Sequence, residues 1–192
     1  MNATKALHHV TAVAGSAQGN LDFYEGVLGQ RLVKTTVNFD DPGTYHLYYG
    51  DRTGSPGTIM TFFPWRHVKR GYPGNGETGA VAYAAPIDSM SYWEERLTAA
   101  GAQLKGTVER FGEPVLVFED PAGLSLEIVG QHAGVATSPW VEGPVPTEHV
   151  LQGFQGVTLW VRRLEPTAAL LQEGLGYSLV GSEGDRHRFR TG

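Results

Sequence analysis

The sequence predicts an α+β protein built from repeated βαβββ modules that form cupped mixed sheets, with the third module incomplete. Three observations favour this fold class. Short β-branched and aromatic runs alternate with helical patterns in an order that recurs along the chain. One helix ending appears twice, far apart in the sequence. The 26 glycines and 11 prolines separate these elements with turn sequences.

The first module is expected over residues 1–66, in the order β-α-β-β-β. A strand at residues 7–13 precedes a helix at residues 20–28, where apolar residues have helical spacing. Gly29 then suits the position that ends a helix. Further strands are predicted at residues 31–37, 45–49 and 58–63, separated by Asp-Pro-Gly and Gly-Ser-Pro-Gly turns.

The same order returns in a second module, residues 67–130, and starts again in a third, residues 152–192. A linker rich in Pro, Gly, Ser and Thr separates them at residues 131–151. The clearest internal match pairs FYEGVLGQRLV, residues 23–33, with LLQEGLGYSLV, residues 170–180. The third copy lacks its last strand and therefore leaves an open sheet edge. We expect the natural protein to be longer, or a partner to cover that edge.

The predicted elements of the later modules follow the same spacing rules. They are strands at residues 79–85, 103–109, 114–119 and 125–129 with a helix at 89–100, and then strands at 156–161, 179–181 and 186–190 with a helix at 166–175.

Composition narrows the class of function. The net charge of −5 and the pI of about 5.8 argue against a nucleic-acid partner, because phosphate binding needs a basic surface. The chain has no cysteine, which excludes disulfides, thiolate ligands and cysteine nucleophiles. No apolar run is long enough for a membrane span, and the first residues do not resemble a signal peptide. A cytoplasmic location is the default expectation.

Two adjacent histidines, His8 and His9, lie in the first predicted strand. Successive side chains on a strand face opposite sides, so His9 and Thr11 share one face and His8 lies on the other. A neutral imidazole is a common ligand for iron, zinc and copper. Either histidine can equally be a structural residue with a satisfied hydrogen bond, and one histidine alone makes no metal site.

Glu127 lies in the otherwise apolar last strand of the second module. Burying a carboxylate is costly unless it is paired or bound to metal, which makes Glu127 a second candidate ligand. The alternative is a solvent-facing carboxylate on a half-exposed strand. Aligning the repeats places Glu127 at about the position of Phe62.

His46 and Tyr48 alternate on the strand YHLYY, where they could hold a planar ring on one face of the sheet. Ordinary packing of aromatic residues in a sheet is the competing interpretation. His67, His132 and His149 lie in a polar loop or in the linker and are expected to be solvated. Motifs for serine nucleophiles, phosphate loops, zinc proteases and dinucleotides are missing from the sequence, so a metal site is the catalytic hypothesis that remains.

Several motifs together carry a family resemblance that covers essentially the whole chain. They are HHVT at residues 8–11, VNFDDPGTYHLYYGD at 37–51, GSPGTIMTFFPW at 54–65 and GFQGVTLWVR at 153–162. These motifs resemble the vicinal-oxygen-chelate superfamily, which includes glyoxalase I, bleomycin-resistance proteins and extradiol dioxygenases. The closer resemblance is to the subgroup of hydroquinone ring-cleaving dioxygenases.

The resemblance implies four modules in two cupped barrels, with a metal held by a histidine of the first module and by a histidine and a glutamate of the last. Carried over by position, His9 would be the first metal ligand, His8 an acid/base or hydrogen-bond donor, and Thr11 a residue that positions the ring. The implied cofactor is Fe(II), with Mn(II) as the alternative, and the implied substrates are a small hydroquinone- or catechol-like aromatic compound and O2. The other two ligands have no counterpart among these 192 residues, so this chain alone is expected to be catalytically incomplete.

Two other functions stay open at this point. If the first and second modules paired into one cup, His9 and Glu127 could serve a glyoxalase-like or epimerase-like metal enzyme, completed across a homodimer. Alternatively, a metal-free module of the bleomycin-resistance type could bind a small aromatic compound between Tyr45, His46, Tyr48 and Phe62. Metal content separates the metal enzymes from the binding module, and oxygen uptake separates the dioxygenase from the glyoxalase-like enzyme.

Overall fold

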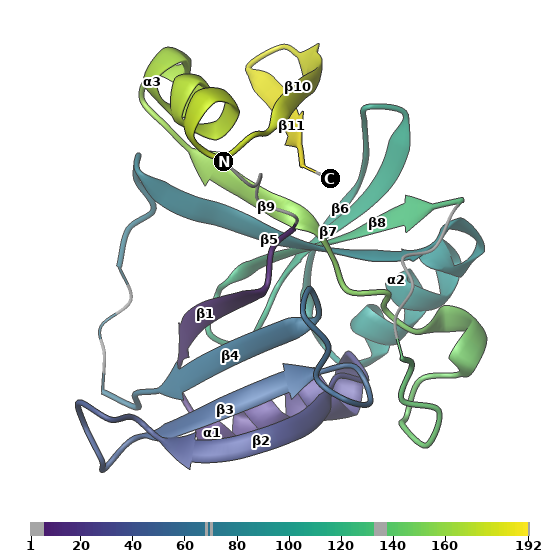
Figure 1. The fold of residues 1–192 in the computed structure, drawn as a ribbon. Helices are drawn as coiled ribbons and strands as arrows, with labels where there is room; N and C mark the ends of the chain where they lie inside the picture. The colour runs from purple at the N-terminus through teal and green to yellow at the C-terminus, as the bar shows by residue number, and fades with distance from the viewer. Residues whose placement is uncertain (1–5, 68, 70, 133–137, 192) are drawn as a thin grey trace.

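The first β-sheet, sheet A, has the strand order β1-β4-β3-β2 (Figure 1). The computed structural model describes residues 6–67, 69, 71–132 and 138–191. The strands of sheet A are β1 (His9–Ala14), β2 (Arg31–Val37), β3 (Tyr45–Gly50) and β4 (Ile59–Pro64). β1 runs parallel to β4, whereas β3 is antiparallel to both of its neighbours. Because β1 is an edge strand, one of its sides has no ladder partner within the described residues.

The second sheet, sheet B, joins the second module to the third. Its order is β6-β7-β8-β5-β9. The strands are β5 (Glu77–Pro86), β6 (Gln103–Arg110), β7 (Glu113–Glu119), β8 (Ser125–Gln131) and β9 (Phe154–Trp160). The parallel β5–β8 pair repeats the β1–β4 pair, and β9 adds to β5 in antiparallel orientation. The repeated modules predicted from sequence are therefore present.

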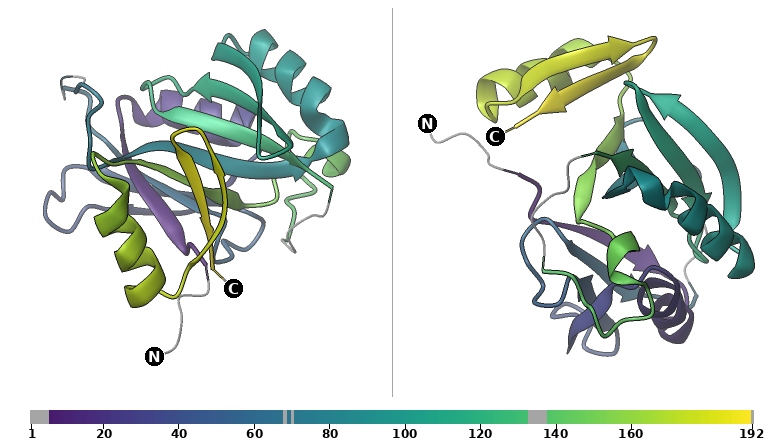
Figure 2. Two further views of the ribbon diagram at one scale, coloured as in Figure 1. Left: turned by 90° about the horizontal axis from the view of Figure 1, so that it is seen from above. Right: turned by 90° about the vertical axis from the view of Figure 1, so that its right-hand side faces the viewer.

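The third module continues from β9 into a helix and a hairpin, β10 (Ser178–Glu183) and β11 (Arg186–Arg190). These two strands pair with one another in a separate ladder. The hairpin and the helix before it lie at the opposite end of the molecule from sheet A (Figures 1 and 2).

The helices of the first and third modules end in the same unusual way. Short α-helices, α1 (Ala17–Leu21) and α3 (Leu164–Ala169), widen into π-turns, η1 (Asp22–Val27) and η4 (Leu170–Gly174). In both copies a leucine N–H donates to the carbonyl five residues earlier, over 2.9 Å from Leu28 to Phe23 and over 3.1 Å from Leu175 to Leu170. Gly29 then takes a positive φ of 68°, as expected of a residue that ends a helix.

Sheets A and B share one hydrophobic core, which also contains the helix α2 (Met90–Ala99). A short 3-10 turn, η2 (Ile87–Ser89), leads into α2. At the centre of the core, the fully buried Tyr24 ring packs against Phe62 and Tyr49 of sheet A. Its hydroxyl donates to Asp120 of the second module over 3.1 Å. The first and second modules therefore pack with their helix-facing sides together.

Residues 138–151, which precede the third module, pack on the first two modules. A 3-10 turn, η3 (Thr147–His149), places the His149 ring on Tyr92, with ring centroids 4.1 Å apart. His149 Nδ1 lies 2.9 Å from the Ser89 hydroxyl, and Trp93 Nε1 donates to the His149 carbonyl over 3.0 Å. The expectation of a solvated His149 is therefore wrong, because its ring covers part of α2.

Three modules meet at Gly153. Its carbonyl accepts a hydrogen bond from the N–H of Ala84 in the second module. The next residue, Phe154, donates its N–H to the Gly57 carbonyl of the first module. Gly57 in turn donates its N–H to the carbonyl of His8. Gly153 has a positive φ of 89°, and a Cβ atom there would lie 2.8 Å from the Gly57 carbonyl oxygen. This glycine therefore allows the backbone of the third module to approach the start of β1.

None of the helices within the described residues is long and apolar enough to cross a membrane.

We expect Gly153→Ala to lower the free energy of unfolding by about 1–3 kcal/mol, because the substitution combines a strained φ with a close contact to backbone. Urea denaturation followed by circular dichroism measures the change. Gly156→Ala is the matched control, since a Cβ atom at this position of β9, three residues further along the chain, would meet open space. An equal loss in both variants would contradict the explanation.

The Tyr24 hydroxyl should contribute more to the free energy of unfolding than the hydroxyl of the neighbouring Tyr49. We expect Tyr24→Phe to cost about 1–3 kcal/mol of unfolding free energy, because it removes the donor to a buried carboxylate. Tyr49→Phe should cost nothing or stabilise, because the Tyr49 hydroxyl is buried with no partner among the described residues. Thermal unfolding of the two variants in parallel tests the difference, and equal losses would argue against a role for the hydrogen bond.

Candidate functional site

The face of sheet A that points away from α1 carries the candidate residues of the first module. Tyr49 and Phe62 pack on the helix side, so alternate residues of each strand lie on the other side. His9 and Thr11 are exposed there, at the start of the edge strand β1. We call this side the open face. Its members used below are His9, Thr11, Lys34, His46, Tyr48, Thr61 and Phe63.

A continuous set of hydrogen bonds joins three of the predicted residues through one that was not predicted. The Thr61 hydroxyl donates to the Thr11 hydroxyl over 2.9 Å. His46 Nε2 lies 3.0 Å from the Thr61 hydroxyl, and His46 Nδ1 lies 2.8 Å from the Tyr48 hydroxyl. We call these four residues, Thr11, Thr61, His46 and Tyr48, the open-face network.

The His46 ring lies between aromatic neighbours, with its centroid 4.1 Å from those of Tyr48 and Phe63. Burial lowers the pKa of His46, and the positive charge of Lys34 lowers it further, with a smaller contribution from His9. The Lys34 ammonium itself lies 5.2 Å from the centre of the Tyr48 ring. The imidazole is therefore held neutral at physiological pH, which suits a residue with a hydroxyl at each ring nitrogen.

His8 and His9 lie next to one another at the solvent-exposed start of β1. Their Nδ1 atoms are 3.2 Å apart, and the two rings are perpendicular. His9 belongs to the open face, whereas His8 precedes the strand and its carbonyl is fixed by Gly57. An exposed imidazole on an edge strand can serve as one metal ligand.

Two aromatic residues expected to line a binding cup lie elsewhere. Phe62 is completely buried in the shared core, and Tyr45 follows the alternation of Leu47 and Tyr49 on the helix side. His46 and Tyr48 are the pair that reaches the open face.

Glu127 lies in sheet B, on the side that carries Ala82, Val115 and Val129 and not on the side of the shared core. It is 6% exposed, so it is neither a solvent-facing carboxylate nor a free ligand. Arg110 Nη1 lies 2.5 Å from its Oε1 atom. The structure therefore places His9 and Glu127 in different sheets and satisfies Glu127 with an arginine.

The strand faces correct the alignment of Glu127 with Phe62. Phe62 points into the shared core, whereas Glu127 alternates with the core residues Leu126 and Ile128 and points away from it. Thr61, the neighbour of Phe62, lies on the matching side of sheet A and faces Thr11, as Glu127 faces Ala82. Across the β5–β9 ladder, Ala82 faces Gly156. The strand neighbours of Glu127 on the β5 side are therefore Ala82 and then Gly156, which have no ligand atoms in their side chains.

The hairpin β10–β11 covers part of this side of sheet B. Arg188 donates to Glu113 over 2.6 Å, and its guanidinium lies 4.2 Å from the centre of the Phe111 ring. The Phe111 N–H donates to the Glu183 carboxylate over 2.8 Å. Phe111 is also the residue with φ of 52° in the turn between β6 and β7. One ion pair, one hydrogen bond from the Phe111 backbone and the packing of Arg188 on the Phe111 ring therefore fix the third module against the second.

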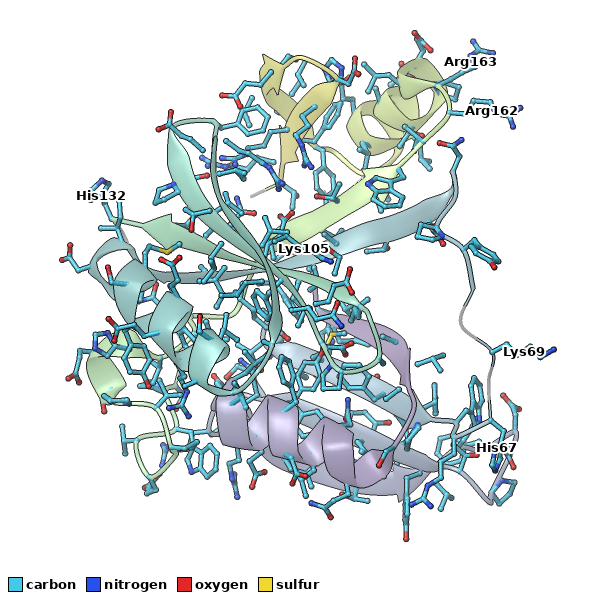
Figure 3. The ribbon with its side chains drawn as sticks, turned by 180° about the vertical axis from the view of Figure 1, so that it is seen from behind. His67, Lys69, Lys105, His132, Arg162 and Arg163 are labelled. Carbon is cyan, nitrogen blue, oxygen red and sulfur yellow. The ribbon has the colours of Figure 1, made fainter. Side chains whose placement is uncertain are left out.

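The other histidines do not converge with His9. His67 lies between β4 and β5, and His132 follows β8; both are exposed and point outward at the edge of the molecule (Figure 3). His187 lies 2.8 Å from the Ser182 hydroxyl within the hairpin. Within the described part of the chain, no three His, Asp or Glu side chains form a group that could hold a metal ion.

Sequence reasoning missed Thr61 and Arg110. The register of the parallel pair reveals Thr61, whereas a threonine within TIMTFFP gives no signal of its own. Arg110 ends a strand at a turn, and charged residues there are normally solvated. The apolar surroundings of Glu127 in LSLEIVG already indicated that it needs a partner.

We expect Arg110→Met to lower the free energy of unfolding by about 3–5 kcal/mol, because it leaves a buried carboxylate unpaired. The double variant Arg110→Met/Glu127→Leu should recover most of that loss, since no buried charge remains. Urea denaturation of both variants measures the difference. An equal loss in the single and double variants would show that packing, and not charge pairing, stabilises this site.

Comparisons with known proteins agree with this architecture. The family model described as the Glyoxalase/Bleomycin resistance protein/Dioxygenase superfamily matches residues 6–128. The chain is 48% identical over 188 residues to a Bacillus subtilis protein provisionally named ring-cleaving dioxygenase MhqO, covering 98% of this chain and 60% of the relative. It is 37% identical over 193 residues to the chlorohydroquinone/hydroquinone 1,2-dioxygenase of Sphingobium indicum, with the same coverage.

Solved structures with a similar fold include members of the same superfamily. A crystal structure of a B. subtilis protein, provisionally described as a dioxygenase, has a TM-score of 0.93 at 47% identity and covers 100% of this chain and 61% of that one. A glyoxalase family protein from Enterococcus faecalis has a TM-score of 0.54 at 21% identity, covers 65% of this chain and 97% of its own, and supports the fold alone. The chain spans about 60% of the length of the curated relatives named above. It belongs to the glyoxalase/bleomycin resistance protein/dioxygenase superfamily.

Proposed function

We propose that this chain forms the front part of a metal-dependent dioxygenase that opens a hydroquinone- or catechol-like ring with O2. The observation that carries the proposal is His9, an exposed imidazole on the open face, in a chain related over nearly its whole length to a chlorohydroquinone/hydroquinone 1,2-dioxygenase. The proposal keeps the division into modules at residues 1–66, 67–130 and 152–192, with a linker at 131–151.

The pairing of modules supports a site that is completed from outside the described residues. β9 adds to the edge of β5, and so joins the second and third modules. The edge of β1 is available for the same kind of addition within the described structure. We propose that the first strand of a further module, in the additional length that the relatives have, pairs with β1 in this way and brings the other ligands beside His9.

Within the described residues, the imidazole of His9 fits one of the ligand positions of such a metal site. His9 offers a nitrogen ligand of the type found with two histidines and one carboxylate around non-haem iron. A bound Fe(II), or Mn(II), would supply adjacent positions for the ring hydroxyl and O2 and would lower the pKa of that hydroxyl. Glu127 is not proposed as a ligand of this metal, because it pairs with Arg110 in the other sheet.

The remaining roles belong to residues around His9. His8, exposed and with its Nδ1 3.2 Å from that of His9, is proposed to exchange a proton with the substrate or to donate a hydrogen bond to it. Thr11 lies on the same face as His9, about 7 Å along the strand, and is proposed to position the ring. The His46 and Tyr48 rings are proposed to border the bound aromatic compound on the β3 side.

Metal content and oxygen uptake of the natural full-length protein test the proposal. We expect close to one iron or manganese ion per chain and oxygen uptake with hydroquinone. His9→Ala should reduce metal affinity by more than about 10-fold, because even partners of the ligands are worth about 10- to 100-fold.

Glu127→Gln is the matched control and should keep its metal. Loss of metal in Glu127→Gln but not in His9→Ala would contradict the assignment. A wild-type protein that binds hydroquinone without metal and without oxygen uptake would support the metal-free binding module instead.

A further inference from the structure

The direction of the hydrogen bonds in the open-face network follows from its chemistry. Thr61 is 1% exposed, so its hydroxyl must be satisfied by protein groups. Its single proton goes to the Thr11 hydroxyl. The Thr61 oxygen must therefore accept from its second neighbour, His46 Nε2, which lies 3.0 Å away.

This requirement fixes the tautomer of His46. A neutral imidazole has one N–H and one acceptor nitrogen, so a proton on Nε2 leaves Nδ1 as the acceptor. The Tyr48 hydroxyl, 2.8 Å from Nδ1, then donates to it. Burial and the nearby Lys34 charge lower the pKa of His46 and keep the ring neutral. All hydrogen bonds thus run in one direction, from Tyr48 through His46 and Thr61 to Thr11.

The network ends on a hydroxyl whose own proton is unused. Thr11 accepts from Thr61 and is exposed on the open face. Within the described part of the chain, the hydrogen bond from Thr61 is the one that the Thr11 side chain forms, and it leaves the Thr11 proton free to be donated. Because the Thr11 oxygen accepts from Thr61, its own O–H bond is directed away from Thr61, and the exposed side of Thr11 is the open face that also carries His9.

We propose that the open-face network is a positioning device that presents the Thr11 hydroxyl as a hydrogen-bond donor to an oxygen atom of a ligand bound beside His9. The inference rests on the proposed function, in which that atom is a phenolate oxygen of a hydroquinone or catechol. A hydrogen bond to a charged oxygen is about twice as strong as a neutral one, so a donor held in place favours the ionised ring. Thr61 acts through Thr11 and need not touch the ligand, whereas His46 orients Thr61 in addition to bordering the bound ring.

The tautomer of His46 gives a test that does not depend on activity. Nitrogen-15 NMR of the histidine rings in the full-length protein should show a protonated Nε2 and an acceptor Nδ1 for His46 at neutral pH. Thr61→Ser should keep this pattern, because it keeps the hydroxyl, whereas the isosteric Thr61→Val should lose it. A proton on Nδ1, or on both nitrogens, in the wild-type protein would overturn the proposal.

Kinetics then test whether the network acts on the ligand. In oxygen uptake with hydroquinone, Thr61→Val should lower kcat by about 10-fold with KM changed by less than about 3-fold, a smaller effect than the about 100-fold cost of deleting a direct oxyanion donor. Thr61→Ser should recover most of the rate. Thr36→Val, opposite His46 in the β2–β3 ladder but without a bond to the network, is the control that should match wild type.

The two proposals fail in different ways. A wild-type protein without oxygen uptake would overturn the proposed function, and the His46 tautomer would still decide the network. Normal turnover in Thr61→Val, or an equal loss in Thr36→Val, would overturn the network while leaving the dioxygenase intact.

Discussion

The shared core between sheets A and B is the constraint on which the rest of the structure depends, and Tyr24 lies at its centre. Its ring packs on Tyr49 of β3 and Phe62 of β4, and its hydroxyl reaches Asp120 across the module boundary. Burial raises the pKa of Asp120, although hydrogen bonds from backbone and from Tyr24 offset part of this effect. Burial, helped by the Asp120 charge, also raises the pKa of Tyr24. Such a buried pair tolerates few arrangements, so it fixes how the first two modules face each other.

Because the core takes the helix-facing side of both sheets, each sheet has a second side available for function. In sheet A this side holds hydroxyl and imidazole groups that hydrogen-bond to one another and end at the exposed Thr11, beside His9. In sheet B the corresponding side is apolar around Glu127, which Arg110 neutralises. Two modules with the same order of elements therefore differ in chemistry, and the sheet with unused donor groups is the one proposed to bind a ligand.

Much of this could be predicted from the sequence, because the signals are local. The repeat of FYEGVLG and LLQEGLG predicted two helices with matching ends, and the structure shows that both end in a π-turn. Alternation placed His9 and Thr11 on one strand face and grouped His46 with Tyr48. The role of Thr61 could not be predicted, since it depends on which strand pairs with β1 and in what register. The packing of His149 on Tyr92 was missed for a similar reason, because a composition typical of linkers says nothing about a neighbouring helix.

The sequence by itself determined the βαβββ order, the repeat and the residue types available at each strand face, because hydrophobic period and turn chemistry act over a few residues. Only the tertiary structure decided that the second module shares a sheet with the third, that His9 and Glu127 lie in different sheets, and that Thr61 links Thr11 to His46. These features depend on pairing between segments distant in the chain. A shift of one residue in that pairing would turn every side chain to the opposite face, and no local pattern records the choice.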